Sequence, residues 1–158
     1  MERTFAMIKP DAVQRRLVGQ VLQRVEQKGL KLVGLKLLQM PKAKAEQLYA
    51  VHKGKPFFDG LVGFISSSPV VVMVLEGQEA IKIWRTLMGG VANKTSGREA
   101  ENGSIRGDYG MSKGFNLVHG SDSPESVARE VPIFFSNDEL VGWKNLDGEW
   151  IYEGPERG

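Results

Sequence analysis

The stretch best suited to chemistry is residues 116–123, Asn-Leu-Val-His-Gly-Ser-Asp-Ser. The apolar pair before His119 can be buried, which would hold the histidine at the end of a strand. Ser123 can cap a following helix whose first turn accepts Pro124, and the free N–H groups at such a helix start attract anions. A histidine beside an anion site suggests phosphate chemistry, although the spacing alone slightly favours a structural histidine.

Several cations near the ends of predicted elements are candidates to hold phosphate oxygens. Lys9 ends the first apolar run, Arg85 lies in a helical segment, and Arg106 lies in Ser-Ile-Arg-Gly-Asp. Arginine offers a planar fork and lysine a point charge, and both suit phosphate. Each cation alone is more often a solvated surface charge. Tyr49 and Phe57 are likewise more often core residues than ligand contacts.

The common nucleotide-binding loops are missing from the sequence. Residues 29–36, Gly-Leu-Lys-Leu-Val-Gly-Leu-Lys, space their glycines as a P-loop does but lack the Gly-Lys-Ser/Thr ending. No Gly-x-Gly-x-x-Gly occurs either, which argues against a Rossmann site. His52 and His119 share no ligand spacing with each other or with a pair of carboxylates. The sequence therefore predicts no metal site made by the protein itself.

The composition is that of an ordinary globular protein. The chain has 158 residues, 41% hydrophobic and 25% charged, and we expect a single domain over residues 1–158. No apolar run approaches the roughly 20 residues of a membrane span, and no signal-peptide pattern is present. The lack of cysteine excludes disulfides and is compatible with a cytoplasmic location. A formal charge of +2 favours anionic ligands but falls short of a dedicated nucleic-acid binder.

Apolar periodicity predicts a mixture of strands and helices. Strands are expected over residues 3–9, 30–40, 70–75 and 115–119, and helices over residues 18–28, 43–52, 58–65, 81–88 and from 123 onward. Because residues 30–40 are apolar on both faces, they are predicted to form a central strand. The connections are unlike parallel crossovers, so we expect an α+β fold of ferredoxin-like type, with helices packed on a four-stranded antiparallel sheet.

Three local features complete this picture. Residues 89–113 show no period and are rich in polar residues, which predicts a long loop with a function or disorder. Pro132 lies inside the last helical pattern, so a kink or an early helix end is expected near Glu130. Residues 143–152 carry two tryptophans and a tyrosine, which predicts that this tail packs against this chain or a neighbouring subunit.

Several of these segments resemble, in the same order, the motifs of nucleoside diphosphate kinases. The strongest likeness lies in residues 116–123 with Glu-Ser following, and in Arg-Thr-Phe leading to Lys-Pro-Asp-Ala-Val-Gln-Arg at residues 9–15. Further matches are Lys-Pro-Phe-Phe (55–58), Ser-Pro-Val-Val (68–71), Arg-Thr-Leu-Met-Gly (85–89) and Ile-Arg-Gly-Asp (105–108). The resemblance covers residues 3–153, which is nearly the whole chain.

This resemblance implies a ping-pong phosphotransferase acting on ATP and other nucleoside di- and triphosphates. His119 would take the γ-phosphate and pass it on, Glu130 would orient the imidazole, and Ser121 would support both. Phe57 would stack on the base, with Leu61 beside it. Mg²⁺ would arrive on the substrate phosphates, without a protein metal cage. By the same resemblance the phosphate donors are Lys9, Tyr49, Arg85, Arg106 and Asn116, with Lys9 and Asn116 also near the ribose hydroxyls.

From the residues alone, the place of Glu130 has two interpretations. A carboxylate on the inward stripe of a helix is costly unless it has a partner, and a place at the margin of the stripe would need none. The resemblance favours the partnered interpretation, with His119 as the partner.

The long loop departs from the family pattern. Where the family has Gly-x-Thr-Asn-Pro, with its threonine touching phosphate, this chain has Gly-Gly-Val-Ala-Asn-Lys-Thr-Ser at residues 89–96. Val91 stands at the threonine position and can donate nothing, so the hypothesis is that Thr95 or Ser96 folds back into the role. Arg16 stands where the family commonly has glycine.

Two alternatives to an active enzyme follow from the same fold. One is a non-catalytic nucleotide- or nucleic-acid-binding module, and the other is a weakened member kept for assembly or regulation. Exposed strand aromatics in an RNP pattern would indicate RNA binding, and residues 3–8 and 115–118 do not supply them. Neither a membrane nor nucleic acid is expected as the main partner. The resemblance implies a homo-oligomer, either a hexamer or a tetramer.

Overall fold

The computed structural model describes residues 1–90 and 95–157. A four-stranded sheet lies at its centre, with the order β2-β3-β1-β4 and every neighbouring pair antiparallel. The strands are β1 (Glu2–Ile8), β2 (Lys31–Gln39), β3 (Pro69–Gly77) and β4 (Val118–Gly120). The predicted α+β fold of ferredoxin-like type is confirmed.

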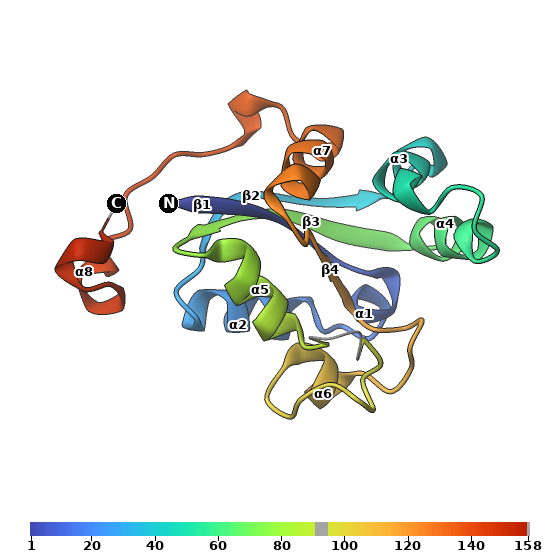
Figure 1. Ribbon diagram of the computed structural model, residues 1–158, viewed down its shortest axis with the longest axis horizontal. Helices are drawn as coiled ribbons and strands as arrows, with labels where there is room; N and C mark the ends of the chain where they lie inside the picture. The colour runs from blue at the N-terminus through green and yellow to red at the C-terminus, as the bar shows by residue number, and fades with distance from the viewer. Residues whose placement is uncertain (91–94, 158) are drawn as a thin grey trace.

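Helices cover both faces of this sheet (Figure 1). The α-helices are α1 (Pro10–Gln14), α2 (Val18–Gln27), α3 (Lys42–Leu48), α4 (Phe58–Ser66), α5 (Ala80–Met88), α6 (Ile105–Tyr109), α7 (Pro124–Phe134) and α8 (Gly148–Ile151). Short 3-10 helices are η1 (Ala50–His52), η3 (Asn137–Glu139) and η4 (Gly154–Glu156). Across residues 1–90 and 95–157, no helix has the length and apolar character that a membrane crossing requires.

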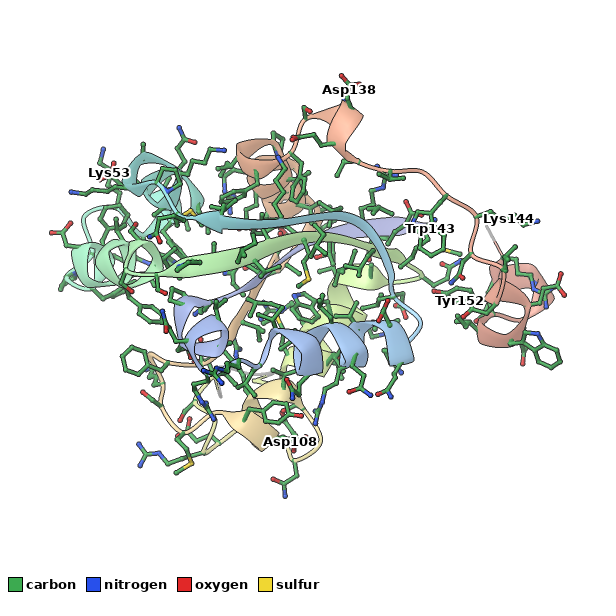
Figure 2. The ribbon with its side chains drawn as sticks, turned by 180° about the vertical axis from the view of Figure 1, so that it is seen from behind. Lys53, Asp108, Asp138, Trp143, Lys144 and Tyr152 are labelled. Atoms are coloured by element: carbon green, nitrogen blue, oxygen red, sulfur yellow. The ribbon has the colours of Figure 1, made fainter. Side chains whose placement is uncertain are left out.

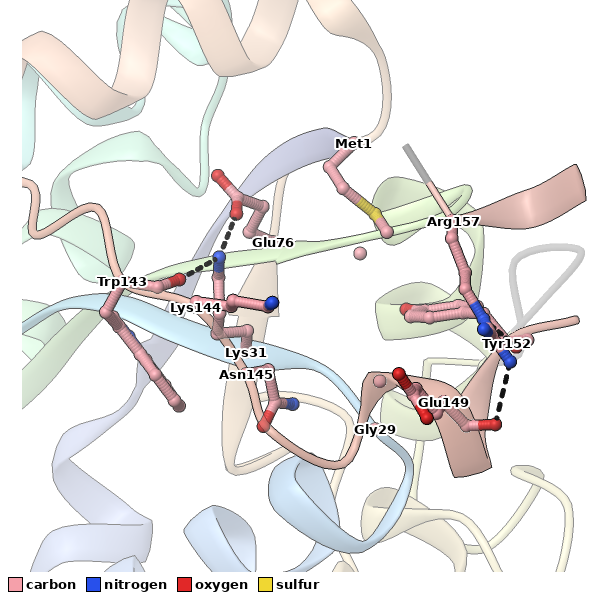
Figure 3. Close-up of a pocket in the computed structure, with 12 residues that line it drawn as sticks. Met1, Gly29, Lys31, Glu76, Trp143, Lys144, Asn145, Glu149, Tyr152 and Arg157 are labelled. Atoms are coloured by element: carbon pink, nitrogen blue, oxygen red, sulfur yellow. Dashed lines mark hydrogen bonds and ion pairs between the residues drawn. The ribbon is translucent and has the colours of Figure 1, made fainter. Parts of the chain in front are cut away.

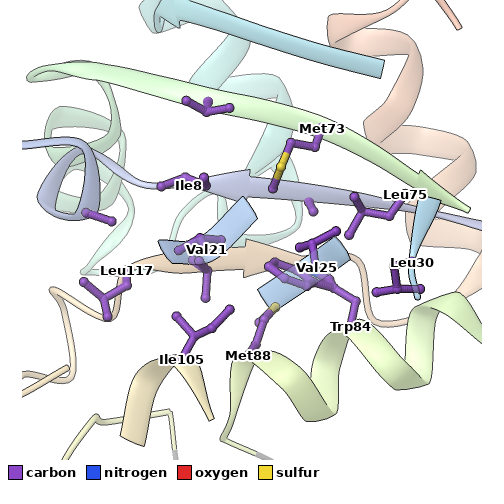
Figure 4. Close-up of a cluster of buried hydrophobic side chains, with 14 of the residues drawn as sticks. Ile8, Val21, Val25, Leu30, Met73, Leu75, Trp84, Met88, Ile105 and Leu117 are labelled. Atoms are coloured by element: carbon purple, nitrogen blue, oxygen red, sulfur yellow. The ribbon is translucent and has the colours of Figure 1, made fainter. Parts of the chain in front are cut away.

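Strand β1 contributes to a core on each face of the sheet, because successive side chains of a strand point to opposite faces. Ala6 and Ile8 belong to the core beneath α2 and α5, which Figure 4 shows around Trp84. Phe5 and Met7 belong to the second core, beneath α3, α4 and α7. Each large apolar side chain that is fully buried contributes about 1.5–3 kcal/mol. Strand β1 is therefore fixed by packing on both faces, and it in turn fixes β4, which pairs with it.

Residues 31–39 form an edge strand, so the predicted central position is wrong. Among the described strands, β2 pairs with β3 alone, and Leu35 and Leu37 are 51% and 68% exposed. An apolar run on both faces of a strand shows that both faces need cover. The apolar pattern does not show whether this chain or another chain covers those faces.

Strand β4 is shorter than the predicted residues 115–119. Phe115 is exposed, and Leu117 has φ +73°, a left-handed value that is incompatible with extended backbone. The strand therefore begins at Val118, and its central residue is His119.

Helix α7 continues through Pro132 to Phe134, so the early end predicted near Glu130 is wrong. Pro132 deprives the carbonyl of Ala128 of its helical donor. Both residues are exposed, so water can satisfy that carbonyl and the helix continues.

The tail of residues 141–157 runs beside the edge of the sheet (Figures 1 and 2). The N–H of Val141 donates to the carbonyl of Val33, and the indole N–H of Trp143 donates to the carbonyl of Leu32, both over 2.8 Å. Trp150 is 90% exposed. The tail thus contacts its own chain through Trp143, while the second tryptophan lies open on the surface.

Candidate functional site

His119 lies at the centre of β4, opposite Met7 of β1. Its carbonyl accepts a hydrogen bond from the indole N–H of Trp84 over 3.2 Å. Gly120 follows, and a Cβ there would collide with the Trp84 ring, so only glycine allows this close packing. The histidine backbone is therefore held by a strand pairing on one side and by α5 on the other.

Glu130 of α7 faces the imidazole. Its Oε2 lies 3.1 Å from Nε2 of His119 and accepts a hydrogen bond from the Ser121 hydroxyl over 2.7 Å. The carboxylate is 4% exposed, which confirms that Glu130 is a partnered residue and not one at the margin of the stripe. Burial acts to raise the pKa of Glu130, but the hydrogen bonds from His119 and Ser121 and the charge of Arg129 hold that pKa below its usual value.

This pairing decides which imidazole nitrogen is free to react. An ionised carboxylate can only accept hydrogen bonds, so Nε2 of His119 must carry a proton and donate this hydrogen bond to Glu130. In the neutral ring Nδ1 then carries the lone pair. The arrangement presents a nucleophilic nitrogen on a fixed ring, because the other nitrogen is tied to α7.

Tyr49 presents its ring edge-on to His119, with the ring centroids 5.7 Å apart. Its hydroxyl is buried and has no hydrogen-bond partner within residues 1–90 and 95–157. Burial, and then the negative charge of Glu130, raise the pKa of Tyr49 above its usual value, so the phenol keeps its proton. A buried donor without an acceptor is costly and is suited to a ligand oxygen.

Lys9 and Arg106 bring positive charge to the same end of the sheet. Nζ of Lys9 donates to Oδ1 of Asn116 over 2.7 Å. The Arg106 guanidinium donates to the carbonyls of Asn116 at 3.1 Å, Gly89 at 3.0 Å and Val118 at 2.8 Å. Both cations are buried, and neither forms an ion pair with a carboxylate among the described residues. Buried charge without a counter-charge is unfavourable and predicts an anionic ligand.

Burial makes the charged form of both cations less favourable, which lowers their pKa values. Burial, followed by repulsion from Arg106, lowers the pKa of Lys9 to about 8. Burial and the charge of Arg85 lower the pKa of Arg106 to about 10. Arg85 itself lies near the end of α5, half-buried, and lines a hollow of about 480 Å³ between α5 and the start of α7.

Phe57 and Leu61 lie at the start of α4, a helix that carries none of these cations. Phe57 is 52% exposed, with the His52 ring 5.4 Å from its own and the Lys55 ammonium 5.8 Å from its centroid. Leu61 is half-buried one helical turn further on. The rings of His119, Tyr49, His52 and Phe57 follow one another at centroid separations of 5.4–6.3 Å, which connects this exposed face to the histidine.

Helix α6 divides the predicted loop of residues 89–113 and carries Arg106. Its first turn is capped by Ser104, whose hydroxyl accepts from the N–H of Gly107. Val91 lies outside the described residues. The carbonyl of Thr95 accepts from the side-chain amide of Asn116 over 3.2 Å, and Ser96 is buried. The hypothesis that one of them replaces the missing threonine stays a prediction.

Asp11 is a further residue of the site, and its place in the Lys-Pro-Asp run of residues 9–11 is the sequence signal for it. The Oδ2 of Asp11 accepts a hydrogen bond of 3.1 Å from the backbone N–H of Leu117. Among the described residues, no cluster of three or more metal-ligating side chains occurs.

A second hollow, of about 400 Å³, lies far from the histidine (Figure 3). It is lined by residues of the tail and by Lys31 and Glu76, which form an ion pair of 2.5 Å. Gly77 at this hollow pairs with Glu2 at the start of β1, whereas His119 pairs near the end of that strand. The two regions therefore lie at opposite ends of the sheet.

Comparison with known proteins agrees with the motifs and the geometry. A family model described as nucleoside diphosphate kinase matches residues 2–140. The chain is 55% identical over 153 residues to a nucleoside diphosphate kinase of Archaeoglobus fulgidus, which covers 97% of this chain and 99% of the relative. It is 51% identical over 153 residues to one of Staphylococcus epidermidis, at 97% and 100% coverage.

Solved structures are similar as well. One is a halophilic nucleoside diphosphate kinase from Halobacterium salinarum in complex with CDP, with a TM-score of 0.91, 49% identity and coverage of 96% of this chain and 99% of that one. Another is a nucleoside diphosphate kinase family protein from Babesia bovis, with a TM-score of 0.90, 49% identity and coverage of 96% and 100%. This chain belongs to the nucleoside diphosphate kinase family.

Proposed function

We propose that this chain, acting as a single domain, transfers the γ-phosphate of a nucleoside triphosphate to a nucleoside diphosphate through a phosphohistidine at His119. The observation that carries the proposal is the His119–Glu130 pair, which leaves Nδ1 free at the end of the sheet where Lys9 and Arg106 are buried. Membership of the nucleoside diphosphate kinase family supports the same reaction.

In the first half of the reaction, the Nδ1 lone pair of His119 attacks the γ-phosphorus. A nitrogen–phosphorus bond forms, and the bond to the bridging oxygen breaks, so its electron pair leaves on the nucleoside diphosphate. The positive charge that develops on the imidazole is stabilised by the carboxylate of Glu130, held by Ser121. In the second half, a terminal oxygen of another nucleoside diphosphate attacks the phosphorus and forms a new oxygen–phosphorus bond. The nitrogen–phosphorus bond breaks, and its electron pair returns to Nδ1, which restores the neutral ring.

Fixed donors stabilise the charge that spreads over the transferred group. We assign this role to four residues with buried donors, and to Arg85, whose charge acts on Arg106. They are Lys9, Tyr49, Arg85, Arg106 and Asn116, with Lys9 and Asn116 also near the ribose hydroxyls. Removal of one such donor is expected to cost on the order of 3 kcal/mol in the barrier.

The base stacks on Phe57, with Leu61 beside it. Every base has a π-face, so this platform accepts nucleotides broadly, and the CDP complex of the halophilic relative supports a pyrimidine nucleotide as one of them. The substrate enters as its Mg²⁺ complex. The cationic Lys9, Arg85 and Arg106 suit phosphates that bring their own metal, since a resident Mg²⁺ site is built from carboxylates.

A homo-oligomer, hexamer or tetramer, is part of this proposal. Edge strand β2 leaves Leu35 and Leu37 exposed, and the tail leaves Leu146 and Trp150 exposed. Exposed apolar edges of this kind are usually covered by another chain. Sedimentation of the protein with Leu37→Lys should show smaller particles than the unmodified protein, whereas Val51→Lys, at a residue with similar exposure outside β2, should not.

We also place the protein in the cytoplasm, where nucleotide substrates are abundant, and cell fractionation tests this.

The experiment that tests the reaction is incubation with γ-labelled ATP and Mg²⁺. We expect an acid-labile phosphate on the protein, its loss in His119→Ala, and its release when any nucleoside diphosphate is added. No label would leave a non-catalytic binding module, and a label that survives in His119→Ala would overturn His119 as the residue that carries the phosphate. A nucleic-acid module is not favoured, since helices cover both faces of the sheet and the strand aromatic Phe5 is fully buried.

A further inference from the structure

The backbone just before the histidine contains a strained turn. The N–H of Val118 donates to the carbonyl of Asn116 over 2.8 Å, and Leu117 between them has φ +73°. This is a γ-turn in its rare, positive-φ form. Leu117 is fully buried, and because it has a Cβ it adopts this φ at a cost that glycine would not have. Such backbone strain persists only where surrounding contacts determine it, and it gathers at functional sites.

Most of the proposed phosphate site is attached to this turn. The carbonyl of Asn116 accepts from Arg106, and its side chain accepts from Lys9. The carbonyl of Leu117 accepts the backbone N–H of Lys9 over 2.8 Å, and His119 follows two residues later. A change in the turn would therefore move the nucleophile and several donors relative to one another.

Asp11 binds the backbone N–H of Leu117, the central residue of this turn. It lies in the first turn of α1, and its Oδ2 accepts the N–H of Leu117 over 3.1 Å. Its Oδ1 is buried with no hydrogen-bond partner in the described part of the chain. Burial raises the pKa of Asp11, and the Leu117 N–H and the Lys9 ammonium act in the opposite direction. A carboxylate oxygen that is buried without a hydrogen-bond partner is costly, which sets Asp11 apart from an ordinary helix-start residue.

We propose that Asp11 is a positioning residue for phosphoryl transfer, because its carboxylate holds the turn at Leu117 and so aligns the phosphate donors with His119. Asp11 need not touch the nucleotide in this role. The inference rests on the proposed role of His119 as the nucleophile. It extends the site to a residue of α1 that lies more than 100 positions away from the turn in the sequence.

Two nearly isosteric variants separate hydrogen-bond acceptance from side-chain volume. Asp11→Asn keeps an oxygen that can accept the Leu117 N–H, and Asp11→Leu lacks one. We expect Asp11→Asn to be phosphorylated by ATP in a single turnover close to the unmodified rate. We expect Asp11→Leu to be slower by about 10- to 100-fold, the effect of a small misplacement, with a much smaller change in KM for ATP. Hydrogen exchange at the Leu117 amide should be faster in Asp11→Leu alone.

Glu139→Leu is the matched control, since Glu139 also accepts a backbone N–H, from Ser136 over 2.9 Å, but outside the site. It should keep the unmodified phosphorylation rate. If Asp11→Leu does not fold, Asp11→Ala takes its place, and thermal unfolding reports which variants are folded. The unmodified rate in a folded Asp11→Leu or Asp11→Ala overturns the proposal, and so does an equal loss in Asp11→Asn, which would assign the effect to charge.

Failure of the proposed function gives a different result. If the unmodified protein carries no phosphate on His119, the transfer reaction is wrong for this chain. The exchange rate of the Leu117 amide still reports whether Asp11 holds the turn. Unchanged exchange in the variants would then reject the anchoring separately.

Discussion

Oε2 of Glu130 lies 3.1 Å from Nε2 of His119, and the two residues come from different elements, α7 and β4. The carboxylate is ionised because the hydrogen bonds and charges around it hold its pKa below the usual value despite burial. It therefore selects the tautomer in which Nδ1 is unprotonated. The proposed role of His119 as the nucleophile therefore depends on this contact, which leaves Nδ1 with the lone pair.

Replacing Glu130 with glutamine should impair the chemical step. The glutamine amide can donate to Nε2 and so favour the tautomer with its proton on Nδ1, and it cannot stabilise an imidazolium. We expect single-turnover phosphorylation to fall by about 100-fold or more, with little change in KM. Ser121→Ala, which removes only the support of the carboxylate, should cost less. An unchanged rate in Glu130→Gln would contradict the assigned tautomer.

Tyr49→Phe should affect activity and stability in opposite directions. Phenylalanine keeps the edge-on ring contact with His119 but lacks the buried hydroxyl that has no partner among the described residues. Removing an unsatisfied polar group should raise the free energy of unfolding by about 1 kcal/mol. The kcat should fall, because a phosphate donor is lost. Chemical denaturation and steady-state kinetics on the same sample test both parts; a fall in both would indicate a structural hydroxyl.

The titration of Lys9 should appear in the pH profile. Its pKa of about 8 in the folded protein means that the ammonium is lost as the pH rises through about 8. We therefore expect kcat/KM to decline above that pH, and the decline in kcat to come at higher pH, because bound phosphate stabilises the charged form. Lys9→Arg remains charged and should lack the decline, whatever its absolute rate.

The same pKa has the opposite effect on stability. An unfolded lysine titrates near 10.5, so between about pH 8 and 10.5 the unfolded chain binds more protons than the folded one. The contribution of Lys9 to the free energy of unfolding should thus rise with pH across that window. Denaturation at several pH values, compared with Lys9→Arg, measures this contribution.

Phe57→Ala should weaken nucleotide binding with little effect on folding. The ring is half exposed, so its removal leaves little cavity, but it deprives the base of a stacking partner worth about 1–3 kcal/mol. The KM should rise about 5- to 100-fold for purine and pyrimidine nucleotides alike, while Phe57→Trp should retain affinity. Trp150→Ala, at an exposed tryptophan in the tail, serves as the control. A loss confined to one base would contradict simple stacking.

Arg16→Gly should stabilise the fold. Arg16 has φ +59°, which a side chain with a Cβ adopts at a cost of roughly 1–2 kcal/mol and glycine adopts freely. Because glycine also loses more freedom on folding, the net gain should be about 0.5–1 kcal/mol. Thermal denaturation measures it, and Gly19→Ala, at a glycine without positive φ, provides a comparison. The positive φ at residue 16 therefore makes glycine the residue type best suited to this position.

Several expectations from the sequence failed for reasons of context. Residues 31–39 are apolar on both faces, yet β2 lies at the edge, because pattern alone does not tell which chain covers a face. Pro132 did not end α7, since the carbonyl it leaves unpaired faces solvent. Strand β4 begins late because Leu117 adopts a positive φ, and nothing in the residue type leucine predicts that value.

The sequence by itself determined the antiparallel α+β fold, the family, and the identity of His119 as the candidate nucleophile, because periodicity and ordered motifs are local properties of the chain. The tertiary structure alone decided how those motifs act together. It brought Glu130 within hydrogen-bond distance of Nε2 of His119, and Lys9 within hydrogen-bond distance of Asn116. It also brought the Asp11 carboxylate to the N–H of Leu117 in the strained turn. Hydrogen bonds between residues far apart in the sequence depend on how sheet and helices pack, and so do the pKa values that follow from burial.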